Sequence, residues 1–289
     1  MKRSLADLSQ LLCAASRRKT VDPYTDIEWP DALEPSQWFT SPELVSLYGT
    51  PAWDRLDDHD RKQLSLFEAV NFYSLNVHGE KALVEGLVKH LYDTADSAWS
   101  ACSPYLHHFI AEENHHMVYF GGFCERYANK IYRDRKISLP RKYAPGEEDF
   151  LFFARVLVFE EVVDALNRRM ARDERLAPIA RRINQAHHLE ETRHLVFGRR
   201  ITSELFRRHS PQWSRETLDR VRGYLESYVL NTWRDYANPD VYVDLGLAQP
   251  YDLAEEMFHD EGRRVHWRAM TAGCVRYLLE QGMIERAPV

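Results

Sequence analysis

Apolar residues recur at intervals of three and four along most of the chain, whereas the two-residue alternation of a half-buried strand is scarce. This spacing is typical of amphipathic helices. Four long helices are predicted at about residues 60–93, 98–131, 148–171 and 174–208. Two more follow at about 214–235 and 251–281, separated by the loop ANPDVYVDLGLAQP. The expected fold class is therefore all-α.

Two segments that contain proline organise these helices. The opening segment has five prolines before residue 58, so we expect it to be irregular, with short helical pieces at most, and to wrap around the helices. The second segment, RKISLPRKYAPGEED, predicts a long crossing connection that divides the four long helices into two hairpins. The expected architecture is a single domain, residues 1–289: a four-helix bundle with an irregular N-terminal wrap and two additional C-terminal helices.

The composition and charge of the chain limit the kinds of molecule that it is expected to bind. A chain of 289 residues that is 44% hydrophobic can bury a large core. The formal net charge of −6 is spread along the chain without a basic tract, which argues against nucleic-acid binding. No apolar run is long enough for a membrane span, and the N-terminus lacks the pattern of a signal peptide. Four widely spaced cysteines fit reduced thiols, so we expect a cytoplasmic protein whose partners are small molecules or proteins.

The fourth long helix contains an unusual cluster, HHLEETRHLV, with three imidazoles and two carboxylates in a helix that must bury one face. His187, Glu191 and His194 are spaced by four and then three residues, so their side chains lie on one face, about a turn apart. That face presents one carboxylate and two imidazoles, which are suitable ligands for a metal ion.

The second long helix repeats the Glu-x-x-His step in AEENHHMVYF, either as Glu113 and His116 or as Glu112 and His115. The first pair is preferred for two reasons. It shares a helix face with two phenylalanines, and it matches EETRH, where the second of two adjacent carboxylates precedes the histidine by three residues. Two Glu-x-x-His helices in a four-helix bundle need one carboxylate from each of the other two helices to complete a dinuclear metal site.

Those two carboxylates are predicted to be Glu80 and Glu160. Glu80 shares its face with mostly apolar residues, whereas Glu85 shares its face with charged ones. Glu160 likewise lies with apolar residues, whereas Glu161 lies on a more polar face. Glu80 is followed by its Glu-x-x-His glutamate after 33 residues, and Glu160 is followed by its counterpart after 31. In each hairpin, the glutamate on the second helix is therefore expected at about the same height along the bundle as the glutamate on the first.

A buried, ionised carboxylate costs several kcal/mol unless a cation or a hydrogen-bond partner offsets it. Four carboxylates carry −4 and two divalent ions carry +4, and a mixed imidazole and carboxylate set with open positions suits iron better than a closed zinc site. A single Glu-x-x-His is common by chance on a solvated face, but two of them at matched separations favour a metal site. The remaining histidines lack such spacing; His107, His108, His188, His259 and His266 are expected at the surface or outside the ligand set.

The stretches EENHH, FEEVV and HHLEETRH, with the lengths between them, resemble the AurF-like non-haem diiron oxygenases, which are ferritin-like proteins and include arylamine N-oxygenases. The resemblance covers about residues 60–210. Its most specific element is a third histidine, here His187, beside the four carboxylates and two histidines of ordinary ferritin-like diiron sites. It implies one iron held by Glu80, Glu113 and His116, a second held by Glu160, His187 and His194, and Glu191 shared between them.

The resemblance also implies a reaction. Two Fe²⁺ ions would bind O2 as co-substrate, and a peroxo-diferric intermediate would oxidise an amine to a hydroxylamine or nitro group in a biosynthetic pathway. The chain shows no flavin or nicotinamide fingerprint, so a ferredoxin or reductase is expected to supply electrons. The substrate is a small molecule, either free or tethered to a carrier protein, and a homodimer is expected.

Other functions stay open at this stage. A similar diiron site can serve a hydroxylase or desaturase that acts at carbon, or a ferritin-like protein that oxidises and stores iron. A metal-free helical interaction protein would require the predicted ligand face to be exposed. Metal analysis distinguishes the last possibility from the others, and turnover of an amine under O2 distinguishes an oxygenase from an iron-storage protein.

Overall fold

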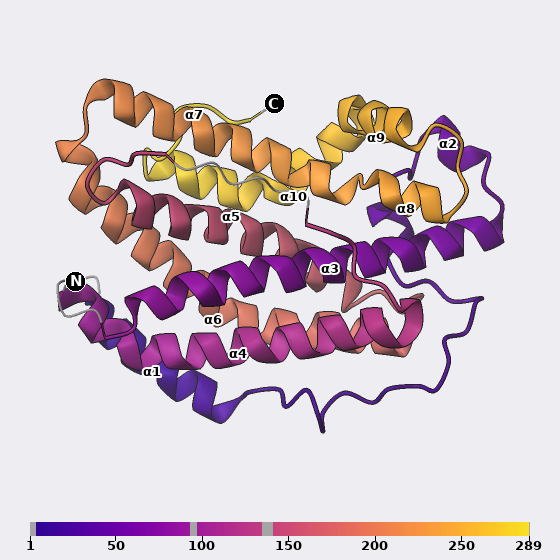
Figure 1. Ribbon diagram of the computed structural model, residues 1–289, viewed down its shortest axis with the longest axis horizontal. Coiled ribbons are helices and arrows are strands. Elements are labelled where there is room, and N and C mark those ends of the chain that lie inside the picture. The colour runs from indigo at the N-terminus through magenta and orange to yellow at the C-terminus, as the bar shows by residue number, and fades with distance from the viewer. Residues whose placement is uncertain (1–3, 93–96, 135–140, 289) are drawn as a thin grey trace.

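The computed structural model describes residues 4–92, 97–134 and 141–288, and it confirms the all-α prediction for those ranges (Figure 1). The only strand-like pairing found there is a single-residue parallel bridge between Trp38 and Leu176. The elements are α1 (Leu5–Arg18), η1 (Pro42–Leu44), α2 (Pro51–Asp54), α3 (Asp58–His90), α4 (Ser97–Ala128), α5 (Glu147–Met170), α6 (Pro178–His209), η2 (Ser210–Gln212), α7 (Arg215–Asn231), η3 (Thr232–Tyr236), α8 (Pro239–Asp244), α9 (Pro250–His259) and α10 (Glu261–Glu280).

Helices α3, α4, α5 and α6 form the predicted bundle, with α3 packed against α4 and α5 against α6. Helix α3 ends at His90, while the predicted end at residue 93 lies outside the described residues. Residues 135–140 of the predicted crossing connection also lie outside them. At the start of α5, Gly146 has a φ of +70°, and three acidic residues fill the first turn, where the helix dipole favours negative charge.

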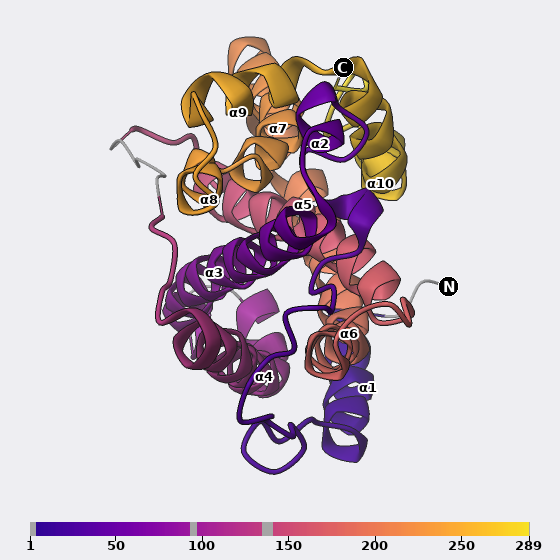
Figure 2. The same cartoon turned by 90° about the vertical axis from the view of Figure 1, so that its right-hand side faces the viewer.

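The prediction that the first 58 residues hold only short helical pieces was wrong, because α1 is 14 residues long. Ser4 and Asp7 form a capping box at its start. Leu5 and Leu12 are buried where α1 packs against α4 and α6 (Figure 2). The prolines that suggested irregular structure begin only at residue 23, beyond the end of this helix.

The C-terminal part contains more helices than the two that were predicted. The single helix expected at 251–281 is divided into α9 and α10 at Asp260, which has extended backbone and accepts a hydrogen bond from the backbone N–H of Arg263 at 2.8 Å. The short helix α8 occupies part of the predicted loop. Helices α7 and α10 pack on α5. Among the described residues, no helix combines the length and apolar character that crossing a bilayer requires.

The apolar core is divided into two clusters along the bundle. On α3, Tyr73 belongs to one cluster and Leu83 to the other; on α4, Phe120 belongs to the first and Phe109 to the second. The same division occurs on α5 and α6. Polar residues of the four long helices lie between the clusters, at the height of Glu80. The fold therefore buries one polar layer inside an apolar bundle.

Helix α3 approaches α5 closely at two glycines. A Cβ atom at Gly79 would lie 2.6 Å from the ring of Phe159, and one at Gly86 would lie 2.2 Å from the ring of Phe152. Both distances are shorter than a carbon–carbon contact allows. The absence of a side chain at these two positions lets α3 and α5 pack closely, and Gly79 lies next to Glu80 of the polar layer.

Candidate metal centre

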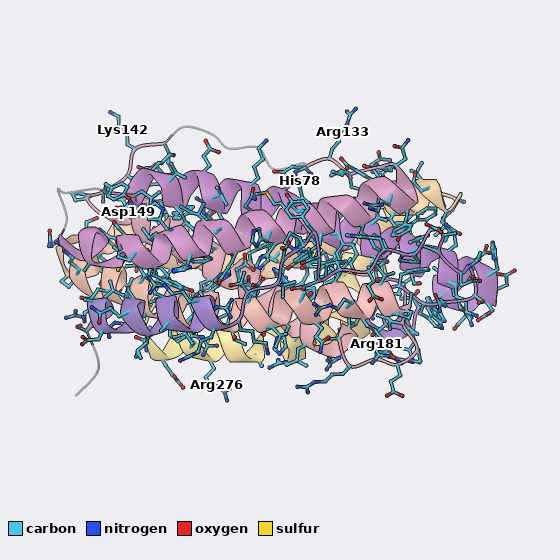
Figure 3. The ribbon with its side chains drawn as sticks, turned by 90° about the horizontal axis from the view of Figure 1, so that it is seen from below. His78, Arg133, Lys142, Asp149, Arg181 and Arg276 are labelled. Atoms are coloured by element: carbon cyan, nitrogen blue, oxygen red, sulfur yellow. The ribbon has the colours of Figure 1, made fainter. Side chains whose placement is uncertain are left out.

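Charged side chains such as Arg133, Lys142 and Arg276 point away from the helices (Figure 3). The centre of the bundle is different, because the seven ionisable residues predicted from the sequence lie together there and none is more than 2% exposed. They are Glu80 on α3, Glu113 and His116 on α4, Glu160 on α5, and His187, Glu191 and His194 on α6. All four helices of the bundle contribute to this cluster.

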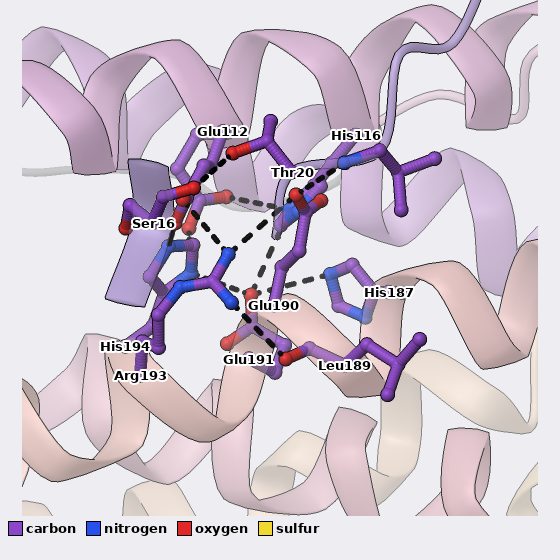
Figure 4. Close-up of polar contacts among 12 residues, drawn as sticks. Ser16, Thr20, Glu112, His116, His187, Leu189, Glu190, Glu191, Arg193 and His194 are labelled. Atoms are coloured by element: carbon purple, nitrogen blue, oxygen red, sulfur yellow. Dashed lines mark hydrogen bonds and ion pairs between the residues drawn. The ribbon is translucent and has the colours of Figure 1, made fainter. Parts of the chain in front are cut away.

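His116 on α4 and His194 on α6 direct their Nδ1 atoms at the same carboxylates. His194 Nδ1 lies 2.7 Å from Glu191 Oε1 (Figure 4). It also lies 2.8 Å from Glu113 Oε1. His116 Nδ1 lies 3.4 Å from Glu113 Oε2 and 3.6 Å from Glu191 Oε1. These four residues offer ligand atoms that all lie within 4.8 Å of one another.

The third imidazole completes the cluster on the α3 and α5 side. His187 Nε2 lies 3.3 Å from Glu80 Oε1 and 3.5 Å from Glu191 Oε1. Glu160, His187 and Glu191 form a second group with ligand atoms within 4.8 Å, and Glu80, His116 and His187 form a third. Glu191 is shared by two of the three groups. His187 contacts Glu80 and His194 contacts Glu113, although the family resemblance assigns the members of each pair to different irons.

The hydrogen bonding of the cluster is incomplete in a way that fits metal ions. Both carboxylate oxygens of Glu80 and both of Glu113 are buried without a hydrogen-bond partner, as are His116 Nδ1 and His187 Nε2. Buried polar atoms are nearly always satisfied, and a group of such atoms facing one another needs an explanation. Carboxylate oxygens and imidazole nitrogens are ligands for iron and related ions, so these residues fit a dinuclear metal centre.

The charges in the cluster also depend on one another. Burial, together with neighbouring carboxylates, raises the pKa of Glu80 and of Glu160 well above the usual value. Burial opposes a charge on His116, yet the carboxylate of Glu113 and its neighbours raise the pKa of that imidazole to about 9. Burial and the two other imidazoles lower the pKa of His187 well below its usual value. Divalent cations would favour the ionised carboxylates and displace these protons.

Charged residues outside the cluster contact the second ring nitrogen of His116 and of His194. His116 Nε2 on α4 lies 3.1 Å from Glu190 Oε2 on α6, and His194 Nε2 on α6 lies 2.8 Å from Glu112 Oε2 on α4. Arg193 bridges the two carboxylates, with Nη2 2.8 Å from Glu112 Oε1 and 3.5 Å from Glu190 Oε1 (Figure 4). In the Glu-Glu pairs of α4 and α6, the first glutamate therefore orients the imidazole of the opposite helix, and the second faces the centre.

The sequence-based reasoning did not assign Glu112, Glu190 or Arg193 a role. In the sequence, only the doubled glutamate in EENHH and in EETRH indicates that a second carboxylate lies close to each metal-binding face. The segment after α1 also reaches this network, because the backbone N–H of Val21 donates to Glu190 Oε1 at 2.9 Å.

The glutamates and histidines that the sequence analysis placed outside the ligand set do not lie in the cluster. Glu161 pairs with Arg199, Glu85 is exposed, and His115 is partly exposed. His188 is partly exposed and contacts Asp164.

A cavity lies beside the cluster, between α3, α5, η3 and α10. Its walls include four aromatic residues: Phe72, Trp233, Tyr236 and Trp267. The ring of Phe72 is 6.5 Å from that of Phe120, which in turn lies 5.0 Å from the imidazole of His187. The rings of Phe72 and Phe120 therefore lie in succession between the cavity and His187.

The polar end of this cavity contains Glu68 and Arg263. Both oxygens of the Glu68 carboxylate accept hydrogen bonds from the backbone N–H of Ser46 at 3.0 Å, and Tyr242 Oη lies 2.7 Å from Ser46 Oγ. Burial raises the pKa of Glu68 to about 7, although its hydrogen bonds to Ser46 act in the opposite direction. Arg263 is 5% exposed and donates to the backbone carbonyl of Glu43 at 3.2 Å.

A four-helix bundle that buries two Glu-x-x-His pairs and two further glutamates has the architecture of the dinuclear carboxylate proteins. The family model described as p-aminobenzoate N-oxygenase AurF matches residues 2–282, so the chain belongs to the AurF family. This match confirms the family resemblance inferred from the motifs, and it indicates a diiron oxygenase.

Two mycobacterial proteins are similar over most of the chain. They are the uncharacterized protein Mb0909 of Mycobacterium bovis and the uncharacterized protein Rv0885 of Mycobacterium tuberculosis. Each is 25% identical over 279 residues, covering 88% of this chain and 73% of its own length. Their names give no substrate, so they do not refine the function beyond the family.

Proposed function

We propose that this protein is an O2-dependent N-oxygenase that uses two iron ions to oxidise a small amine. Glu80, Glu113 and His116 would hold one iron, Glu160, His187 and His194 the other, with Glu191 between them. Bound as Fe²⁺, the metals would supply the redox chemistry that activates O2 next to the substrate. The third buried imidazole, His187, carries the proposal, because it lies within the cluster of a chain that belongs to the AurF family.

The residues of the chain have separate tasks in this reaction. The four carboxylates balance the charge of two divalent ions, and the carboxylates of Glu112 and Glu190 keep two imidazoles in a fixed orientation. The apolar clusters on both sides of the polar layer exclude bulk water. The cavity behind Phe72 has several aromatic walls, but its volume of about 30 Å³ would have to widen before it could hold an aromatic amine.

The overall reaction converts an amine N–H bond into N–OH. One atom of O2 enters the product and the other leaves as water, while two electrons and two protons enter from outside. An external ferredoxin or reductase would supply the electrons, and the amine could arrive free or attached to a carrier protein.

The test is single turnover with isotopically labelled O2. Apoprotein is loaded with Fe²⁺ under anaerobic conditions and then mixed with labelled O2 and a panel of arylamines. Mass spectrometry should find one labelled oxygen in a hydroxylamine after a single turnover; a nitro product requires a further O2 and should appear only when a reductant allows more turnovers. Glu160→Ala should abolish the product, and Glu161→Ala serves as the matched control because that side chain pairs with Arg199 outside the cluster.

Other outcomes would replace the proposal. Label at carbon, or loss of hydrogen from carbon, would indicate a hydroxylase or desaturase instead. Consumption of many Fe²⁺ ions per chain with no organic product would indicate an iron-handling protein.

A further inference from the structure

The imidazole of His187 has a different partner from the other two. Its Nδ1 atom is hydrogen bonded to the side-chain amide of Asn167, which lies on α5 seven residues after Glu160. Both His187 and Asn167 are fully buried. The contact joins α5 to α6 directly behind the cluster, and neither residue is exposed to water that could replace the other as a hydrogen-bond partner.

The unsatisfied atoms of this pair define its hydrogen bonding. His187 Nε2 faces Glu80 and Glu191 and has no hydrogen-bond partner, and Asn167 Oδ1 is also buried without a partner. A neutral imidazole carries one N–H and one lone pair. If the lone pair at Nε2 binds a metal, then Nδ1 carries the hydrogen and needs an acceptor. A half-turn of the Asn167 amide places its oxygen at that position and satisfies both groups.

We propose that Asn167 is a positioning residue that accepts a hydrogen bond from His187 Nδ1–H and so keeps Nε2 free to bind metal. The inference rests on the proposed diiron centre. His116 and His194 are held by the carboxylates of Glu190 and Glu112, which make an imidazole a stronger donor. The neutral amide of Asn167 fixes the tautomer of His187 without that effect. The third imidazole is thus a weaker donor than the other two.

The first measurement uses the wild-type protein loaded with Zn²⁺, which is diamagnetic. Nitrogen–proton correlation spectra of the imidazoles report which ring nitrogen of His187 carries hydrogen. We expect the hydrogen on Nδ1. A hydrogen on Nε2 of His187 would overturn the proposal, and this measurement requires no variant to fold.

The second measurement compares two variants by titration of the apoprotein with Co²⁺. Asn167→Leu removes the acceptor at similar volume and should weaken binding at one of the two positions by about 10–100-fold, with a changed visible spectrum. Asn167→Asp keeps an acceptor and should restore wild-type affinity or exceed it. A merely structural role predicts that both variants bind Co²⁺ as the wild type does, or that both lose it equally; either result would overturn the proposal.

A matched control separates this effect from general loss of stability. Asn184, on α6, is also a fully buried amide. It donates to Tyr73 Oη at 3.1 Å and to the backbone carbonyl of Ala180 at 2.7 Å. Asn184→Leu should lower the melting temperature and leave the Co²⁺ spectrum unchanged. Failure of the proposed function is distinguishable, because a wild type that binds two Co²⁺ ions but oxidises no amine leaves the inference about Asn167 intact.

Discussion

His194 Nε2 lies 2.8 Å from Glu112 Oε2, so an imidazole of α6 is oriented by a carboxylate of α4. Glu112 is not expected to bind metal, because its other oxygen is occupied by Arg193 at 2.8 Å. Glu112→Gln should therefore weaken iron binding by about 10–100-fold without abolishing it, as changes in outer partners of metal-bound histidines commonly do. Competition with a chelator measures the change. Wild-type affinity in this variant would show that the hydrogen bond does not orient the imidazole.

The second prediction concerns stoichiometry. Four carboxylates at the centre can neutralise two divalent ions, so protein purified after growth with iron should contain close to two Fe per chain, by elemental analysis. Glu113→Ala and Glu160→Ala should each lose most of this iron, because each removes a buried ligand. Glu161→Ala should keep it. One zinc per chain with no iron would contradict the dinuclear assignment.

The seven residues of the centre could be predicted from sequence because helix periodicity determines which residues share a face. Glu113 and His116 were separated from Glu112 and His115 in this way, and only the first pair has both side chains fully buried. Periodicity gives the direction of a side chain but does not identify the residue opposite it. The reciprocal contacts of Glu112 and Glu190, and that of Asn167, depend on how two hairpins meet, which no spacing within one helix specifies.

Helix boundaries were less predictable for local reasons. One extended residue, Asp260, divides α9 from α10, and the apolar spacing continues on both sides of it. Helix α1 was missed because the prolines that follow it dominated the interpretation of the whole opening segment.

The third prediction separates two adjacent histidines. His187→Ala removes one neutral ligand and leaves all four carboxylates, so two irons should still bind, but at one position with an affinity lowered at least as much as in Asn167→Leu, and the rate of amine oxidation should fall by about 10–100-fold. His188 points to Asp164 and is partly exposed, so His188→Ala should resemble the wild type in both measurements. If His188→Ala is inactive and His187→Ala is active, the helix face has been assigned wrongly.

A fourth prediction uses the raised pKa of Glu68. In the folded protein this pKa is about 7, compared with 4.5 as the reference for the unfolded chain. Between these values the folded state binds a proton that the unfolded state releases, so the stability contributed by protonated Glu68 is present below pH 4.5 and is lost as the pH rises through 7. Glu68→Gln removes this dependence. Urea unfolding from pH 5 to 8 should show the variant gaining stability relative to the wild type as the pH rises; a constant difference would contradict the raised pKa.

The fifth prediction tests the close approach of α3 to α5. Gly79→Ala places a methyl group against Phe159, and this overpacking should destabilise the protein by about 1–3 kcal/mol. The better helix propensity of alanine should offset part of that loss. Gly121→Ala on α4 is the control, because a Cβ atom there has no neighbour within 4 Å. That control should gain up to about 1 kcal/mol from helix propensity alone. Denaturant unfolding compares the two, and equal stability changes would show that Gly79 is not needed for packing.

The hydrogen bond from the Val21 backbone N–H to Glu190 gives the N-terminal segment a thermodynamic connection to the centre of the bundle. Glu190 is 1% exposed and holds His116, so a chain in which this segment detaches leaves a buried carboxylate without one of its donors. Anything that favours the ordered segment must then favour metal binding, and metal binding must favour the ordered segment by the same free energy. A stretch that contributes no ligand thereby shares in setting the affinity of the site.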